Sequence, residues 1–275
     1  MKNEMFHLSR TWAQERKKIA LIPTMGALHQ GHLTLVTEAK KEYDKIVVSI
    51  FVNPMQFGPS EDFSKYPRTE NADTQLLLDI GVDALFTPAV DEVYGGHSQT
   101  VVSVPKIAEI LCGTSRPGHF EGVCTVVTKL FNITCPDGAF FGKKDFQQFT
   151  ILKHLVKDLN FNINMHGVET VRETDGLAMS SRNRYLSSAE REEAAEIYRA
   201  MLAVREEFLR GEGNVKLLRD TFVQKLSNPI FKIEYCEIRD SENLQALTAV
   251  GNTSALILVA VNIGRTRLID NLLLS

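Results

Sequence analysis

Two histidines stand three residues apart in the segment PTMGALHQGH, which spans residues 23–32. On a helical turn His29 and His32 face the same way, and Gly31 between them lets a ligand approach the backbone closely. A helix that begins here adds unpaired N–H groups and a positive dipole end. Imidazoles so placed can donate hydrogen bonds to phosphate oxygens as charge builds up during attack at phosphorus. The segment therefore predicts a phosphate site.

Two lysines follow a strand-like run in the sequence GKKD at residues 142–145. The segment approaches a phosphate-binding P-loop, but the spacing from Gly138 to Gly142 is one residue too short. Asp145 also replaces the Ser or Thr that would hold magnesium. Two interpretations stay open, a lysine that reaches a phosphate and a solvated charged turn.

Two further loops carry polar groups. The segment GLAMSSRN at residues 176–183 offers hydroxyls, backbone donors and a guanidinium, or is simply a linker with a helix cap. The segment NPMQFG at residues 53–58 has amides that could grip a polar substrate, although turn chemistry would also explain its Asn, Pro and Gly.

The elements that must position these loops alternate in type over the first half of the chain. Hydrophobic runs predict strands at residues 18–23, 45–52, 84–87, 101–104, 138–141 and 162–170, and periodic patterns predict helices at 31–43, 73–80, 120–131 and 149–159. This alternation is typical of a parallel sheet with helices on both faces, an α/β fold that binds nucleotides at strand carboxyl ends.

The second half changes character. Ser187 and Glu190 have capping-box spacing and predict the start of a long helix that reaches about residue 210. A second helix at 215–226 and strands at 232–239, 255–263 and 266–269 complete a smaller α+β domain. We expect a boundary that gives domains of residues 1–171 and 172–275.

Composition excludes several classes of protein. A formal net charge of −3 argues against broad nucleic-acid binding, so basic residues for anionic substrates must be concentrated at one site; the candidates are Arg116, Lys143, Lys144, Arg182 and Arg184. The longest apolar run is too short to span a bilayer, and the N-terminus has no apolar signal core; we expect a cytoplasmic protein. The four cysteines form no C-x-x-C pair and predict reduced thiols. No G-x-S-x-G, H-E-x-x-H or G-x-G-x-x-G motif is present.

Taken together, these motifs resemble the pantothenate synthetase family. The matching segments occur in the family's order, at residues 23–32, 49–58, 66–69, 116–122, 140–148 and 171–186. The resemblance implies a Rossmann-like nucleotide-binding domain, a smaller C-terminal domain that acts as a lid, a homodimer and magnesium. It also implies a two-step reaction of ATP, pantoate and β-alanine.

The resemblance also implies roles for individual residues. Those expected to be catalytic are His29, His32, Lys144 and Arg182. Those expected to contact ATP are Met25, His29, His32, Gly142, Lys144, Asp145, Val171, Met179, Ser180, Ser181 and Arg182. Those expected to hold pantoate are Met25, Gln56, Phe57 and Gln148, and Gln56 would also contact β-alanine. Asn53 and Tyr66 match positions near the pocket, and Asp73 is expected near magnesium.

The chain departs from the family pattern at two positions. Where the family usually has Gly-Glu-Lys-Asp-Tyr-Gln-Gln, Lys143 reverses a charge and Phe146 lacks a hydroxyl. Two other functions stay open at this point. One is a different H-x-G-H nucleotidylyltransferase, which would make a stable nucleotide product. The other is a nucleotide-binding module without catalysis.

Overall fold

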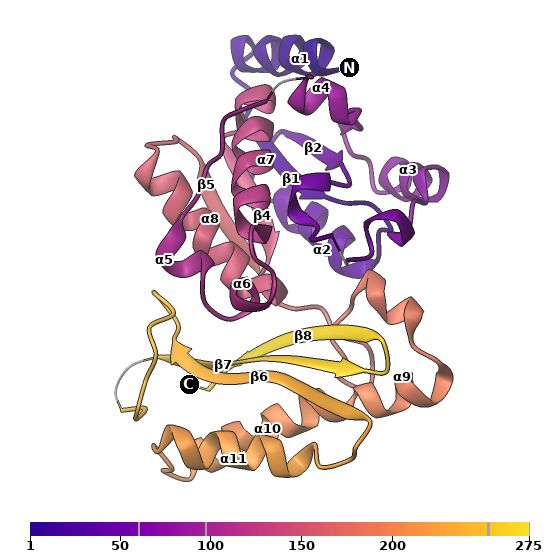
Figure 1. Ribbon diagram of the computed structural model, residues 1–275. Helices are drawn as coiled ribbons and strands as arrows, with labels where there is room; N and C mark the ends of the chain where they lie inside the picture. The colour runs from indigo at the N-terminus through magenta and orange to yellow at the C-terminus, as the bar shows by residue number, and fades with distance from the viewer. Residues whose placement is uncertain (60, 97, 252–253, 275) are drawn as a thin grey trace. The chain divides into compact units, whose positions relative to one another are not determined.

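The computed structural model describes residues 1–59, 61–96, 98–251 and 254–274 (Figure 1). It forms two compact units. The first contains Met1–Lys143 and Gln147–Glu169, and the second contains Lys144–Phe146 and Thr170–Ser275. We expected a domain boundary after residue 171, and the resemblance implies that the second domain acts as a lid. Both stay predictions.

The first unit is built on a parallel sheet of five strands in the order β3-β2-β1-β4-β5. The strands are β1 (Ile19–Thr24), β2 (Lys45–Ile50), β3 (Ala84–Phe86), β4 (Gly138–Gly142) and β5 (Asn164–Val168). The chain moves outward on one side of β1 through β2 and β3, then returns to the other side for β4 and β5. The predicted Rossmann-like fold is confirmed, with its switch in strand order between β1 and β4.

Helices cover both faces of this sheet. Leu35, Val36 and Ala39 of α2 (Gln30–Ala39) and Leu77 of α3 (Glu70–Asp79) form one core with β1, β2 and β4. Right-handed crossovers place the helices that follow β3 and β4 on the opposite face. These are α7 (His119–Thr134), which packs on β1 and α1 (Lys2–Gln14), and α8 (Phe146–Asp158).

Shorter helices connect these elements. They are η1 (Pro54–Gln56), η2 (Phe63–Lys65), α4 (Val90–Tyr94), α5 (Pro105–Ala108), α6 (Cys112–Ser115) and η3 (Lys143–Asp145). Gly122 on α7 lets η1 come close, because a Cβ there would lie 2.4 Å from the Met55 carbonyl oxygen. The main chain around Gln56 is therefore packed directly on α7.

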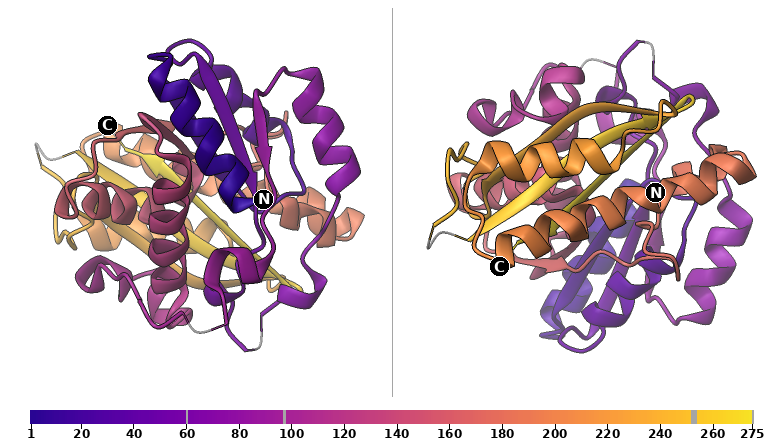
Figure 2. Two further views of the ribbon diagram at one scale, coloured as in Figure 1. Left: turned by 90° about the horizontal axis from the view of Figure 1, so that it is seen from above. Right: turned by 90° about the horizontal axis from the view of Figure 1, so that it is seen from below.

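The second unit is an antiparallel sheet of β6 (Phe231–Asp240), β7 (Ala255–Ile263) and β8 (Thr266–Leu273), in that order. Helices α10 (Glu196–Leu209) and α11 (Val215–Lys225) lie along one face, as the right-hand view of Figure 2 shows. Met201, Leu218 and Phe222 are completely buried against β7. The remaining elements are η4 (Ser181–Tyr185) and α9 (Ser188–Ala194). This is the small α+β domain that we predicted.

Two predictions about local structure were wrong or incomplete, and one helix was not predicted. Residues 101–104 form no strand; the Val102 amide instead donates to Thr125 Oγ1 of α7 at 3.0 Å. The long helix predicted after Ser187 is two helices separated at Ala195, which is buried. Helix α1 was not predicted, although Met5, Ser9 and Trp12 form a buried helical stripe.

Candidate active site

The first candidate site lies at the carboxyl end of β1, beside the switch in strand order. The chain turns sharply after Thr24, with positive φ angles of 82° at Gly26 and 51° at Ala27. This turn leads directly to His29, the N-cap residue of α2. The loop therefore places both histidines at a helix N-terminus, as the sequence predicted.

The two imidazoles are held in one tautomer by the backbone. Nδ1 of His29 accepts from the Gly31 amide at 3.2 Å, and Nδ1 of His32 accepts from the His29 amide at 3.3 Å. An N–H group can only donate, so both Nδ1 atoms are unprotonated and the ring proton is on Nε2. The ring centroids are 4.1 Å apart. Each ring thus carries its donor on the edge away from its own backbone contact.

Asp73 fixes the turn that leads to His29. Its carboxylate, 2% exposed, accepts from the Ala27 and Leu28 amides, both at 2.9 Å, and from Thr69 Oγ1 at 3.0 Å. Three donors thus occupy most of the lone pairs of this carboxylate. These contacts hold the loop that leads to His29. The magnesium contact that we expected of Asp73 stays a prediction.

Gln56 and Met25 come together in the first unit. Gln56 Nε2 lies 3.1 Å from Met25 Sδ, and Gln56 Oε1 accepts from Asn53 Nδ2 at 3.1 Å. Phe57 packs edge-on against Tyr66, with ring centroids 5.8 Å apart. The Gln56 amide thus lies beside a thioether, and the next residue, Phe57, belongs to an aromatic pair. Polar and apolar groups of this kind suit a small ligand with both polar and apolar parts.

A buried network on the other side of η1 holds the main chain of Gln56. Its carbonyl oxygen accepts from His119 Nδ1 at 2.8 Å, and His119 Nε2 lies 2.9 Å from an Arg116 nitrogen. Arg116 forms a bidentate pair with Glu61, at 2.8 and 2.6 Å. Burial alone would raise the pKa of Glu61, but Arg116 holds it below the usual value. Arg116, which we considered for anion binding, is therefore committed to a carboxylate of the chain itself.

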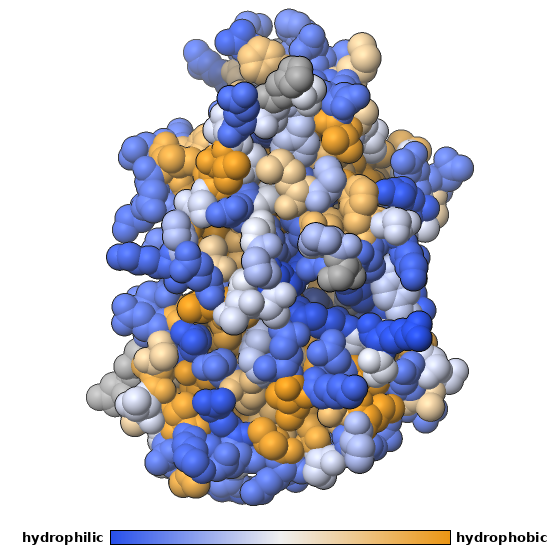
Figure 3. Space-filling view, viewed as in Figure 1, coloured by the Kyte–Doolittle hydropathy of each residue, from blue (hydrophilic) through white to orange (hydrophobic). Residues whose placement is uncertain are grey.

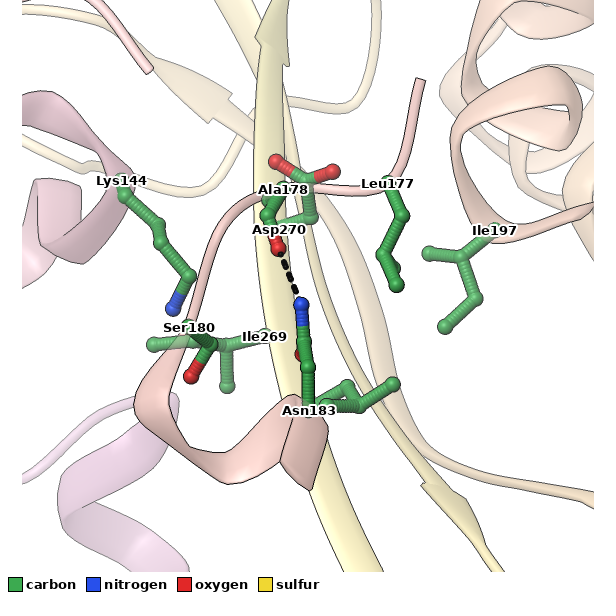
Figure 4. Close-up of a pocket in the computed structure, with 9 residues that line it drawn as sticks. Lys144, Leu177, Ala178, Ser180, Asn183, Ile197, Ile269 and Asp270 are labelled. Carbon is green, nitrogen blue, oxygen red and sulfur yellow. Dashed lines mark hydrogen bonds between the residues drawn. The ribbon is translucent and has the colours of Figure 1, made fainter. Parts of the chain in front are cut away.

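The second unit contains a pocket lined by Lys144, Ser180 and Asp270, with Ala178, Asn183 and apolar side chains around them. In Figure 4 the Lys144 side chain extends toward Ser180. The carbonyl oxygen of Lys144 accepts from Asn271 Nδ2 at 2.9 Å. Lys144 and Ser180, both of which the resemblance implies contact ATP, thus line one pocket.

The loop that carries Ser180 is anchored by residues that sequence reasoning missed. Arg172 forms a bidentate pair with Asp270, at 2.6 and 3.0 Å, and stacks on Tyr198 with its guanidinium carbon 3.8 Å from the ring centroid. Ser180 Oγ caps η4 by accepting from the Arg182 amide at 3.3 Å. No local pattern could reveal the Arg172 pair, because its members lie 98 residues apart.

The other predicted site residues divide between the units. Gly142 ends β4 in the first unit, where Gln148 lies on α8. The second unit holds Asp145 in η3, Val171 and Met179 joined by a 3.0 Å backbone hydrogen bond, and Ser181 and Arg182 in η4. Their roles toward a ligand stay predictions.

On the role that the family resemblance implies for Gln148, the variant Gln148→Ala should weaken pantoate use far more than ATP use. The neighbouring Gln147 is structural: its amide bonds Cys112, Ile107 and Ile110 at 2.7–3.1 Å. Gln148 is half-buried at the start of α8. Loss of a polar partner in a ligand pocket costs roughly 1–3 kcal/mol. Michaelis constants for both substrates measure the effect, and equal rises would contradict the assignment.

Lys143→Glu should change the Michaelis constant for ATP by only a few-fold. Lys143 pairs with Glu169, an exposed side chain at the end of β5, which indicates a surface position. Exposed charges are screened within about 8–10 Å at ordinary ionic strength. Most of the change should therefore vanish at high salt. A tenfold or larger rise in the Michaelis constant for ATP that persists at high salt would mean that the Lys143 side chain enters the ATP site.

Two further properties concern membranes and metals. No helix within the described residues is long and apolar enough to cross a membrane, and Figure 3 shows polar residues interspersed with apolar ones over the face in view. Within the same residues no group of three or more His, Cys, Asp or Glu side chains is arranged to hold a metal ion.

The fold and the histidine loop define a class of protein: an α/β nucleotide-binding protein with an H-x-G-H motif at the switch point of its sheet. A model of the family described as pantoate-beta-alanine ligase matches residues 1–273. The chain therefore belongs to the pantoate–β-alanine ligase family, also called pantothenate synthetases.

Individual relatives agree over nearly the whole chain. A pantothenate synthetase of Thermosipho africanus is 48% identical over 271 residues, covering 98% of this chain and 97% of the relative. The crystal structure of pantothenate synthetase from Thermus thermophilus is 44% identical, with a TM-score of 0.91 and 94% of each chain covered. A pantoate-beta-alanine ligase structure from Francisella tularensis is 37% identical, with a TM-score of 0.81, and covers 99% of this chain and 95% of that one.

Proposed function

We propose that this chain joins pantoate to β-alanine with ATP, through a pantoyl-adenylate. In the first step the pantoate carboxylate forms a bond to the α-phosphorus, and pyrophosphate leaves. In the second step the amine of β-alanine attacks the acyl carbon, loses a proton and displaces AMP. The Francisella tularensis structure is described as a complex with beta-gamma ATP and beta-alanine, which supports ATP and β-alanine as substrates here.

The observation that carries the proposal is the histidine pair at the N-terminus of α2. Carboxylate and triphosphate repel each other, so donors must stabilise the charge that develops on phosphate oxygens in the transition state. His29 and His32 each carry such a donor on Nε2, held in place by the backbone. We assign Lys144, Ser180, Ser181 and Arg182 to phosphate oxygens of ATP as well.

We assign pantoate to the Gln56 and Met25 region of the first unit. The amide of Gln56 suits a carboxylate or hydroxyl, while Met25 and Phe57 suit the dimethyl group. No nucleophilic side chain is needed, because two bound substrates react with each other. The acyl-adenylate hydrolyses readily, so a closing second unit would protect it from water.

Magnesium would enter with ATP, whose phosphate oxygens are the ligands that this ion prefers. The Asp73 carboxylate accepts from three donors of the chain, so we propose that the ATP phosphates supply most of the contacts to the ion. We also propose that the chain forms a homodimer and lies in the cytoplasm. Sedimentation of the purified chain would measure its oligomeric state.

Pyrophosphate exchange tests the function. The chain should exchange labelled pyrophosphate into ATP when pantoate is present and β-alanine is absent, and should release AMP when β-alanine is added. Exchange that requires β-alanine would contradict a free-standing adenylate. Exchange with another acceptor but not with pantoate would favour a different nucleotidylyltransferase, and ATP binding without exchange would favour a non-catalytic module.

A further inference from the structure

A line of hydrogen bonds in the first unit runs from Tyr94 to Gln56. Tyr94, the last residue of α4, donates its hydroxyl proton to Asn53 Oδ1 at 2.6 Å. Asn53 Nδ2 donates in turn to Gln56 Oε1 at 3.1 Å. The Asn53 side chain is 1% exposed and that of Gln56 is 8% exposed. Both amides are therefore buried where a wrong orientation would leave polar atoms without partners.

The surroundings of Asn53 determine which way its amide points. The Met55 amide can only donate, and it lies 3.3 Å from Oδ1. The Gly122 carbonyl oxygen can only accept, and it lies 3.1 Å from Nδ2. With Tyr94 as a second donor to Oδ1, the Asn53 amide has its two donors and two acceptors on matching sides.

Tyr94 acts as a donor because it keeps its proton. Burial raises the pKa of Tyr94 to about 12, and the hydrogen bond to Asn53 lowers it only in part. Its ring also contacts Phe51, with centroids 6.2 Å apart, and lies 5.4 Å from the Lys129 ammonium. These ring contacts would survive the loss of the hydroxyl alone.

The orientation of Asn53 fixes that of Gln56. Because Gln56 Oε1 accepts from Asn53, its Nε2 must lie on the opposite side, toward Met25 Sδ. The Gln56 amide therefore presents N–H groups on the Met25 side, where a carboxylate or hydroxyl oxygen can accept them. With the opposite orientation it would present an oxygen and repel a carboxylate.

We propose that Tyr94 is a positioning residue that, together with the Met55 amide and the Gly122 carbonyl oxygen, holds the Asn53 and Gln56 amides so that Gln56 donates to the carboxylate-bearing substrate. The inference rests on the proposed function, in which Gln56 contacts pantoate. In this proposal Tyr94 acts on the substrate through Asn53 and Gln56. With its amide held this way, Gln56 favours a ligand that carries a hydrogen-bond acceptor. Tyr94 therefore contributes to substrate specificity and not to the adenylation step.

The test is Tyr94→Phe in the full-length chain, with pantoate affinity as the readout. A neutral hydrogen bond supports an affinity change of roughly threefold to tenfold. We expect the Michaelis constant for pantoate to rise by that factor, with the turnover number and the Michaelis constant for ATP near wild type. Tyr43→Phe is the matched control: it removes a hydroxyl that lies 2.8 Å from His166 Nε2, near the amino end of β4, and should leave both constants unchanged.

A double-mutant cycle adds a readout that general destabilisation would not move. Asn53→Asp keeps an acceptor for Tyr94 but loses the donor to Gln56 Oε1, so it should weaken pantoate use more than Tyr94→Phe does. Adding Tyr94→Phe to Asn53→Asp should then raise the Michaelis constant for pantoate little further, because the hydrogen bond from Asn53 to Gln56 is already lost.

Two outcomes overturn the inference alone, given a wild-type chain that exchanges pyrophosphate with pantoate. One is a Tyr94→Phe variant with wild-type pantoate constants. The other is equal weakening for pantoate and ATP together with a lower melting temperature, which would make the hydroxyl a general structural group. A well-folded wild-type chain without pantoate-dependent exchange would instead overturn the proposed function, and this inference with it.

Discussion

His32→Ala should slow pantoate-dependent pyrophosphate exchange by roughly a hundredfold or more, the scale on which loss of one transition-state donor acts. The physical reason is the fixed tautomer: Nδ1 of His32 accepts from the His29 amide, so Nε2 carries the proton that a phosphate oxygen can accept. Alanine removes that donor. Exchange kinetics at saturating ATP and pantoate measure the loss.

Two amide variants separate this role from the support that His32 gives to the helix start. His32→Asn keeps a short acceptor for the His29 amide and loses the distal donor, so it should fold normally and remain nearly as slow as alanine. His32→Gln reaches further with a donor and should recover part of the rate. Near-native exchange in a well-folded His32→Asn variant would make His32 a capping residue only.

Asp73→Ala should lower both stability and activity. The Ala27 and Leu28 amides would lose their shared acceptor inside the protein, and each unpaired buried donor costs roughly 1–3 kcal/mol. The turn with positive φ at Gly26 and Ala27 would then be less well held. Because reacting groups must be placed accurately, we expect catalysis to fall by about a hundredfold. Thermal unfolding and exchange kinetics measure the two effects.

Asp73→Asn serves as the matched control, and it also tests the magnesium contact. Its single amide oxygen can serve one of the two backbone donors while its NH₂ faces the other, so it should lie between wild type and alanine in stability. The magnesium concentration for half-maximal exchange should be unchanged in this variant. A large rise in that concentration, with normal stability, would support Asp73 as a metal ligand.

The sequence by itself determined the elements whose signals are local. Hydrophobic runs such as 18–23 and 45–52 identify buried strands because a parallel strand covered on both faces needs apolar side chains throughout. The histidine motif could be placed at a helix start because it follows such a run directly. Ser187 and Glu190 likewise predicted the start of α9, where both capping-box contacts form.

The tertiary structure decided what depends on partners distant in the sequence. Residues 101–104 have a strand-like composition, but Val102 finds its hydrogen-bond partner on α7 instead of in the sheet. No glycine or proline lies at the break between α9 and α10 at Ala195, so the local sequence pattern did not predict it. The contacts that shape the candidate sites join Asp73 to Ala27 across 46 residues, Tyr94 to Asn53 across 41 and Arg172 to Asp270 across 98. Hydrogen bonds of this kind are specified by three-dimensional geometry, so a pattern along the chain can suggest which residues bind a ligand but not which residues hold them in place.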